Sequence, residues 1–256
     1  MKDIFLVRNK ENTDKKIIKY IENHFNIVKF PATAETILVL GGDGSMLKAI
    51  RTYHEIQSSF TGLNYGHIGF LMNKVSTSTL EKLIHSDIKE IEVKMLQADI
   101  FDKNGNCIGR EHAFNDFYFE RTSPQTAKLK ITVNDKIRFD PLTGDGVIVC
   151  TSAGSTAYNV SAGGTIIPIG TNSMVLTGIC PAVFHYWRTS QLPEDSVVTL
   201  EPLDTDKRPV RFIADGNIIE EVEKVKISYS ERKIKLNFVS DHDLREKVMN
   251  LQFSSR

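Results

Sequence analysis

The stretch Gly41-Gly42-Asp43-Gly44 constrains this 256-residue chain more than any other. It follows the apolar run 37–40, typical of a buried parallel strand, and precedes a helical stripe of apolar residues over 46–53, with Ser45 as a candidate N-cap. Glycines let a ligand approach the backbone, and a helix N-terminus attracts anions. Two interpretations stay open: Asp43 accepts a proton from a bound hydroxyl, or it only caps the helix.

Strand-like and helix-like segments alternate over the first ninety residues. Apolar runs predict strands over 4–7, 37–40 and 60–64, and helical spacing predicts helices over 17–25 and 77–85. Such alternation favours an open α/β sheet. We therefore expect an N-terminal open α/β (Rossmann-like) domain over 1–95.

The middle of the chain has a different periodicity. Residues 128–133 and 233–238 alternate apolar and polar side chains, and turn signals stand at Asn104-Gly105, Asn134-Asp135 and Asp215-Gly216. This pattern predicts a C-terminal antiparallel β-sandwich over 96–239 with one helical insertion near 155–162. A last helix, within 240–256, is expected to pack back on the first domain. The predicted fold class is thus α/β plus all-β.

Composition excludes several classes of protein. Thirty-two basic residues balance thirty-two acidic ones and form no dense cluster, so we expect no nucleic-acid partner. The three cysteines are far apart and lack metal-ligand spacing, which favours reduced thiols. The apolar run near the N-terminus, over 4–7, is too short for a signal peptide or a membrane span. These features predict a cytoplasmic protein with no membrane partner.

Further polar or glycine-rich motifs follow predicted strands. The segment 64–71 has two glycines three residues apart, and Asn115-Asp116 lies between two phenylalanines. A carboxylate beside a carboxamide suits a ribose diol, although such a pair also commonly forms a turn.

Two other motifs lie later in the chain. The segment Gly144-Asp145-Gly146 opens a strand that leads into Gly154-Ser155-Thr156-Ala157-Tyr158, where Tyr158 offers a ring for stacking and a packing turn is the alternative. Asp215-Gly216-Asn217 predicts a type I′ hairpin turn.

These motifs, in this order, resemble the NAD kinase family. The resemblance rests on Gly-Gly-Asp-Gly-Ser, Asn-x-Gly-x-Ile-Gly-Phe-Leu, Asn-Asp, Gly-Asp-Gly, Gly-Ser-Thr-Ala-Tyr and Asp-Gly-Asn, which together span residues 41–217. Alone, Gly-Gly-Asp-Gly would also fit relatives of diacylglycerol kinase, sphingosine kinase or phosphofructokinase. The resemblance implies phosphoryl transfer from ATP, or from polyphosphate, to the 2′-hydroxyl of the adenosine ribose of NAD. It also implies Mg²⁺ carried with the donor phosphates and a homodimer or homotetramer.

The resemblance also implies roles for individual residues. Asp43 would be the general base or would orient the hydroxyl, and Gly44 would contact the nucleotide. Asn115 and Asp116 would hold a ribose, and Asp145 would contact the amide or base end. The remaining residues implied in NAD binding, several of them lining the base and ribose, are Thr143, Ala153, Thr156, Ala157, Tyr158, Asn159, Val160, Ser161, Cys180 and Asn217.

The chain departs from the family pattern at four places. Ser45 stands where threonine is usual, Thr143 where arginine is frequent, Ser152-Ala153 where Pro-Thr or Pro-Ser is common, and Cys180 where a small residue such as alanine is frequent. None of these departures removes Asp43. Two alternatives remain at this stage: a lipid kinase with the same Gly-Gly-Asp-Gly motif, and a non-catalytic NAD-binding regulator.

Overall fold

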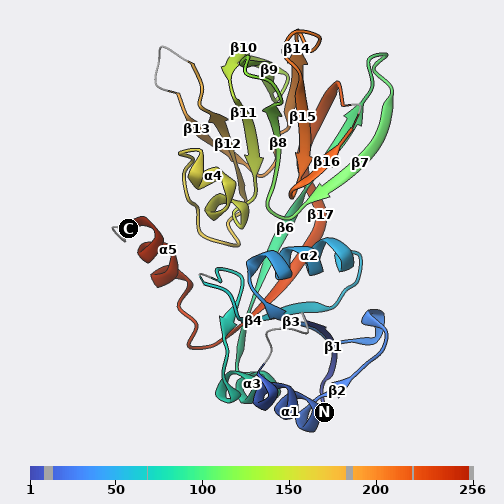
Figure 1. Ribbon diagram of the computed structural model, residues 1–256, viewed down its shortest axis with the longest axis vertical. Coiled ribbons are helices and arrows are strands. Elements are labelled where there is room, and N and C mark those ends of the chain that lie inside the picture. Colours follow the sequence, from blue (N-terminus) through green and yellow to red (C-terminus); the bar gives the residue numbers. More distant parts are fainter. Residues whose placement is uncertain (9–13, 68, 183–186, 221, 254–256) are drawn as a thin grey trace. The chain divides into compact units, whose positions relative to one another are not determined.

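The computed structural model describes the chain except residues 9–13, 68, 183–186, 221 and 254–256, and it divides into two compact units (Figure 1). The first unit comprises Met1–Glu92 with Ile234–Arg256, and the second comprises Val93–Lys233. The chain passes from one unit to the other within two long strands, β6 (Ile88–Phe101) and β17 (Lys224–Val239).

A parallel sheet forms the centre of the first unit. Its main strands are β1 (Asp3–Arg8), β3 (Thr36–Gly41) and β4 (Ser59–Asn64), with β3 between the other two. The short β2 (Asn26–Ile27) pairs with β1, and β5 (Asn73–Lys74) pairs with β4. All these pairings are parallel, which confirms the predicted open α/β class.

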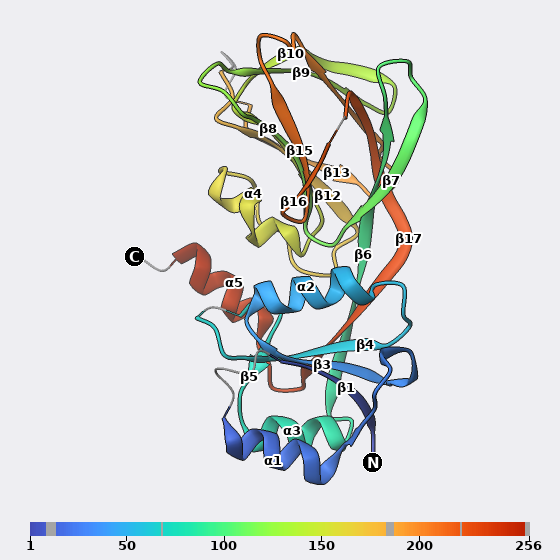
Figure 2. The same ribbon diagram turned by 45° about the vertical axis from the view of Figure 1, so that its right-hand side comes forward.

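Helices cover both faces of this sheet, as Figure 2 shows. The helices α1 (Lys15–His24) and α3 (Thr77–Ile84) lie on one face, where Ile17, Ile21 and Leu80 pack in one core cluster with Leu38 and Leu40. The helix α2 (Asp43–Tyr53) lies on the opposite face. A short 3₁₀ turn, η1 (Pro31–Thr33), precedes β3.

Two details differ from the sequence predictions. The helix α2 begins at Asp43 with Gly42 as its N-cap, so Ser45 lies in the first turn and is not the cap. The end of β17, expected in the second domain, lies in the first unit, where Leu236 pairs with Phe60 of β4 in parallel. Residues 236–239 are consequently all buried, because a parallel strand covered on both faces has no solvent side.

Two antiparallel sheets pack face to face in the second unit. One has the order β10-β9-β14-β17-β6-β7 and the other the order β13-β12-β11-β8-β15-β16. Phe117, Phe119 and Phe212 from the second sheet pack with Leu129 and Leu200 from the first. The predicted sandwich is therefore confirmed. The strand bounds are β7 Cys107–Ala113, β8 Asp116–Arg121, β9 Ala127–Val133, β10 Lys136–Gly144, β11 Gly146–Cys150, β12 Ser173–Ile179, β13 Thr189–Pro193, β14 Val198–Leu203, β15 Val210–Ala214 and β16 Asn217–Ile219.

The predicted turns and helices also form. Asn134 and Asp135 have φ of 50° and 60° between β9 and β10, and Asp215 and Gly216 have φ of 46° and 84° between β15 and β16, as type I′ turns require. The helical insertion consists of η2 (Gly154–Thr156) and α4 (Tyr158–Ser161).

The last helix, α5, spans Leu244–Phe253. Its residue Lys247 bonds to the carbonyls of Gly69 and Met72, so the helix packs on the first unit. The side chains of Leu244 and Leu251 lie outside the described part of the chain, as does residue Ile68. Among the residues that the structure describes, no helix is long and apolar enough to cross a membrane.

We expect Gly146→Ala to destabilise the second unit. Gly146 begins β11, and a Cβ there would lie 1.9 Å from the carbonyl oxygen of Phe119 on the neighbouring strand, so the sheet would have to separate locally. The free energy of unfolding, measured in urea, should fall by about 2–3 kcal/mol. Gly109→Ala is the matched control, because a Cβ on that strand residue has no heavy atom within 4 Å and should change stability little.

Candidate active site

Asp43 stands where β3 turns into α2, at the carboxyl end of the parallel sheet. Its carboxylate does not cap its own helix. Instead the Phe70 N–H donates to Oδ2 at 2.9 Å and the Leu71 N–H donates to Oδ1 at 2.8 Å. The N-cap residue of α2 is Gly42, which has no side chain, so among the described residues the helix N-terminus keeps backbone N–H groups for another acceptor. Ligands of open α/β sheets bind at this edge.

The loop after β4 is shaped to reach Asp43. Gly69 has φ of +70°, and a Cβ there would lie 2.3 Å from the Asn64 amide, so only glycine fits. Gly66 approaches Gly42 closely, and its N–H donates to Asn64 Oδ1 at 2.9 Å. The segment 64–71 therefore holds the aspartate in place through its backbone N–H groups. His67 in this segment is exposed.

Lys247 of α5 braces the same loop from its other end. Its ammonium donates to the Gly69 carbonyl at 2.6 Å and to the Met72 carbonyl at 2.9 Å. Burial lowers the pKa of Lys247, and the negative charge of Asp43 partly opposes that shift. The ammonium thus stabilises both the loop and the carboxylate that the loop holds.

In the second unit, Asp215 organises the Asn115-Asp116 motif. Its Oδ2 accepts the Phe114 N–H at 2.7 Å, and its Oδ1 accepts the N–H groups of Asn115 and Asp116 at 2.8 and 3.0 Å. Asp215 is 5% exposed, so these bonds compensate its lost hydration. Asn115 and Asp116 consequently form a fixed loop end before β8 rather than a free turn.

The loop after β11 closes on this motif. Thr151 donates its hydroxyl to the Phe114 carbonyl at 2.6 Å, and its own N–H bonds to the Asn115 carbonyl at 2.9 Å. Gly154 must be glycine, since a Cβ there would lie 2.1 Å from the same Asn115 carbonyl. Asn115 Oδ1 is buried and accepts no hydrogen bond from the described residues, so this acceptor suits a hydroxyl or amino group of a ligand.

Three predicted residues, Asp116, Asp145 and Cys180, gather around Tyr158. Burial first, and then the charges of Glu120, Cys180, Asp145 and Asp116, raise the pKa of this phenol. The Tyr118 ring packs against it edge-to-face at 5.1 Å. The structure therefore brings Asp116, Asp145 and Cys180 together around a half-buried ring.

The departures from the family pattern are accommodated locally. Ser152 is buried, and its hydroxyl accepts the Gly170 N–H at 3.1 Å, which holds the loop after α4. Cys180 has φ of 45° and is exposed, and Thr143 accepts the Ala182 N–H at 2.8 Å through its carbonyl.

Asn159 differs from the other candidates, because its side chain is used inside the unit. Its Nδ2 donates to the carbonyls of Ser155 and Thr165, and its Oδ1 accepts the Thr177 hydroxyl at 2.6 Å. It is fully buried, so it shapes the α4 loop from within. Of the remaining candidates, Ala153 is buried; Thr156, Ala157 and Val160 are half-buried; and Gly44, Ser161 and Asn217 are exposed.

Sequence reasoning missed three contributors. Asp215 was interpreted only as a hairpin residue, and Lys247 only as part of a terminal helix. Arg121 was not considered, although its Nε donates to Asp145 Oδ1 at 2.6 Å. The hairpin signal at Asp215-Gly216 located the turn, but no local pattern could reveal bonds made across 99 to 101 residues.

Asp116 is 5% exposed, as buried as Asp215. Desolvation, with a further contribution from Asp215, raises the pKa of Asp116 to about 7. Its carboxyl group can therefore exchange a proton near neutral pH. In the part of the chain that the structure describes, no three His, Cys, Asp or Glu side chains form a metal-ligand set.

The two units define a class of two-domain proteins: an α/β domain with a Gly-Gly-Asp-Gly turn, joined to a β-sandwich. Family models for the ATP-NAD kinase N-terminal and C-terminal domains match residues 5–88 and 114–239. The chain is 36% identical to an NAD kinase of Rickettsia typhi and 35% identical to one of Rickettsia prowazekii, over 98% of this chain and 97% of each relative.

Solved structures agree with this fold. A yeast NADH kinase in complex with NADH superposes with a TM-score of 0.84 at 20% identity, covering 100% of this chain and 89% of that one. An NAD kinase from Archaeoglobus fulgidus in complex with ATP gives 0.76 at 18% identity, covering 98% and 97%. The chain belongs to the NAD kinase family and is a phosphotransferase. The lipid-kinase and regulator alternatives are not favoured.

We expect Lys247→Met to lower kcat about tenfold. The variant removes two charge-assisted hydrogen bonds to the loop that holds Asp43, worth about 1.5–3 kcal/mol each, and we expect roughly half of one bond's energy to be lost from the transition state. Because burial lowers the pKa of Lys247, wild-type activity should fall on the alkaline side as the ammonium deprotonates. The pH profile of the variant should lack that limb.

The exposed Lys19→Met variant on α1 serves as its control and should retain both kcat and profile. An unchanged alkaline limb in Lys247→Met would contradict the assignment.

A second prediction concerns Asp116→Asn. A carboxyl group whose pKa is raised in the folded state stabilises the fold fully below its unfolded pKa and loses that contribution as pH rises to about 7. The neutral amide does not titrate. The free energy of unfolding of the variant, relative to that of the wild type, should therefore rise by about 1 kcal/mol per pH unit between pH 5 and 7, as measured in urea. The exposed Asp206→Asn control should show no such trend.

Proposed function

We propose that this chain transfers the terminal phosphoryl group of ATP, or of polyphosphate, to the 2′-hydroxyl of the adenosine ribose of NAD and so makes NADP. One observation carries the catalytic assignment: the Asp43 carboxylate is held by two backbone N–H groups at the carboxyl end of the sheet, beside an uncapped helix N-terminus. A base fixed next to an anion site suits a hydroxyl that attacks a phosphate.

In this proposal Asp43 accepts the proton of the 2′-hydroxyl while the ribose oxygen bonds to phosphorus. The bond from phosphorus to the oxygen of the leaving phosphate chain breaks, and ADP departs when ATP is the donor. The N–H groups of Phe70 and Leu71 keep the carboxylate oriented throughout. Mg²⁺ would be bound by the donor phosphates and would neutralise their charge.

The second unit would bind the NAD. The unpartnered Asn115 Oδ1 would accept a hydrogen bond from a ribose hydroxyl or a base amino group. Tyr158 offers a face for the base, and Asp116 and Asp145 lie around it. Gly44, Thr156, Ala157 and Ser161 would contact the nucleotide mainly through backbone or small side chains.

We also propose a cytoplasmic homodimer or homotetramer. The three cysteines are free thiols, as is usual in a reducing compartment. Ile108, Ile137 and Ile218 are exposed on strands of the sandwich, which supports burial of such edges between subunits.

Purified protein incubated with ATP, Mg²⁺ and NAD should produce NADP, measured by a coupled dehydrogenase assay. Asp43→Asn should lower kcat by at least about 100-fold, because the amide cannot accept the proton. Asp87→Asn is the matched control, since Asp87 is exposed in the same unit. NADP formation by Asp43→Asn at the control rate would refute Asp43 as the base, and replacing ATP by polyphosphate identifies the donor.

A further inference from the structure

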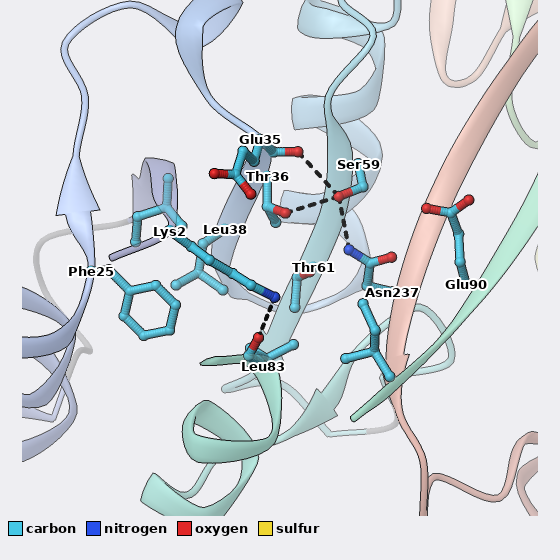
Figure 3. Close-up of a pocket in the computed structure, with 12 residues that line it drawn as sticks. Lys2, Phe25, Glu35, Thr36, Leu38, Ser59, Thr61, Leu83, Glu90 and Asn237 are labelled. Carbon is cyan, nitrogen blue, oxygen red and sulfur yellow. Dashed lines mark hydrogen bonds between the residues drawn. The ribbon is translucent and has the colours of Figure 1, made fainter. Parts of the chain in front are cut away.

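Unpaired polar atoms in this chain differ in whether a ligand can reach them. A cavity of about 200 Å³ lies in the first unit beside β3 and β4 (Figure 3). Ser59 Oγ accepts from Asn237 Nδ2 there at 2.8 Å. Thr61 Oγ1 and Asn237 Oδ1 have no partner among the described residues, but both atoms are fully buried. In the second unit, by contrast, Asp145 has a carboxylate oxygen that is both unpaired and accessible.

The backbone of Asp145 is fixed on both sides, between β10 and β11. Its N–H donates to the Ile179 carbonyl at the end of β12 at 2.8 Å, and its carbonyl accepts the Arg121 N–H at the end of β8 at 2.9 Å. The flanking Gly144 and Gly146 let these strands come close, since a Cβ at Gly144 would lie 2.9 Å from the Ile179 carbonyl oxygen. Only the side chain of Asp145 is therefore left to be oriented.

Arg121 orients that side chain. Its Nε donates to Asp145 Oδ1 at 2.6 Å, and its Nη1 donates to the Ser123 carbonyl at 2.7 Å, so the guanidinium itself is held. Both side chains of the pair are 34% exposed, and an ion pair that accessible adds little to stability. A planar guanidinium held at two points nevertheless keeps a carboxylate in one orientation.

The second oxygen, Asp145 Oδ2, accepts no hydrogen bond from the described residues and keeps accessible surface. Aromatic rings lie beside it. Ile179, which accepts the Asp145 N–H, packs in one apolar cluster with Tyr118 and Tyr158, and these two rings meet edge-to-face at 5.1 Å. Burial, and then nearby charges that include Asp145, raise the pKa of the Tyr158 phenol, which agrees with this placement.

The chemistry of these groups defines what they can recognise. A carboxylate oxygen only accepts hydrogen bonds, and a tyrosine face stacks on planar rings. Together they suit a planar heteroaromatic ring that carries an N–H donor at its edge. NAD has two such groups, the 6-amino group of adenine and the carboxamide of nicotinamide.

We propose that Arg121 is a positioning residue for substrate binding: it holds Asp145 so that Oδ2 accepts an N–H from the amino or carboxamide group on a planar ring of NAD. This inference rests on the proposed function. Arg121 bonds to no group assigned to proton transfer, so it acts on the affinity for NAD and not on the chemical step.

Arg121→Met should raise the Kd and KM for NAD about tenfold, with little change in kcat, in the KM for ATP or in the urea midpoint. Tenfold corresponds to about one charge-assisted hydrogen bond. Arg110→Met is the matched control, because Arg110 Nε donates to Asp99 Oδ1 at the same 2.6 Å on the β6–β7 hairpin. It should leave the Kd for NAD unchanged, and a wild-type Kd in Arg121→Met would overturn the proposal.

A double-mutant cycle tests whether Arg121 acts through Asp145. Asp145→Ala should weaken NAD at least as much as Arg121→Met does, and combining the two substitutions should weaken it no further. Additive losses in the double variant would overturn the proposal, because Arg121 would then act on NAD by another route.

Two neutral NAD analogues identify the recognised group. 3-Acetylpyridine adenine dinucleotide lacks the carboxamide N–H, and nicotinamide hypoxanthine dinucleotide lacks the 6-amino group. Arg121→Met should not weaken the analogue that lacks the contacted group, whereas an equal loss for NAD and both analogues would overturn the proposal. Isothermal titration calorimetry gives these Kd values without turnover. A wild-type chain that binds NAD but forms no NADP would contradict the proposed function and leave this test intact.

Discussion

Two aspartate carboxylates, Asp43 and Asp215, each hold a loop by accepting its backbone N–H groups, and the candidate site residues take their positions from these bonds. Asp43 fixes the loop after β4, and Asp215 fixes the loop before β8. Backbone donors are suited to this task because they cannot rotate away and carry no net charge. A carboxylate satisfied in this way keeps one orientation.

Whether backbone N–H groups compensate a buried carboxylate also sets the electrostatics of the candidate site. Asp215 receives three N–H groups, whereas its neighbour Asp116 is buried beside that charge, so the pKa of Asp116 rises to about 7. Around Asp43 the positive end of α2 and the ammonium of Lys247 add positive potential. Anion recognition can thus come from helix ends and backbone groups in a chain whose net charge is zero.

The parallel sheet of the first unit carries different chemistry at its two ends. At the carboxyl end, Asp43 accepts the N–H groups of Phe70 and Leu71 from the loop after β4. At the amino end, the residues Ser59, Thr61 and Asn237 line a cavity. β17 brings Asn237 to this sheet from the far end of the sequence, which explains why a polar side chain lies buried there.

Sequence periodicity was sufficient for most elements. The apolar runs at 37–40 and 60–64, the helical stripe over 46–53 and the Asn134-Asp135 and Asp215-Gly216 turns all formed as predicted, because local sterics and side-chain alternation act over a few residues. The alternation at 233–238 predicted a strand but led us to place its end in the wrong unit, because the pattern of a strand does not indicate which sheet the strand joins. The Gly-Gly-Asp-Gly motif likewise located Asp43 but not its partners.

The sequence by itself thus determined the two fold classes, the Gly-Gly-Asp-Gly turn and the other candidate motifs, since each depends on neighbours in the chain. Only the tertiary structure decided which groups satisfy the buried carboxylates and that Lys247 bonds to the Asp43 loop. It also decided that Thr61 Oγ1 and Asn237 Oδ1 have no partner among the described residues. Those features depend on contacts between residues far apart in the sequence. Whether a buried polar group finds a hydrogen-bond partner depends on which residues the fold places beside it.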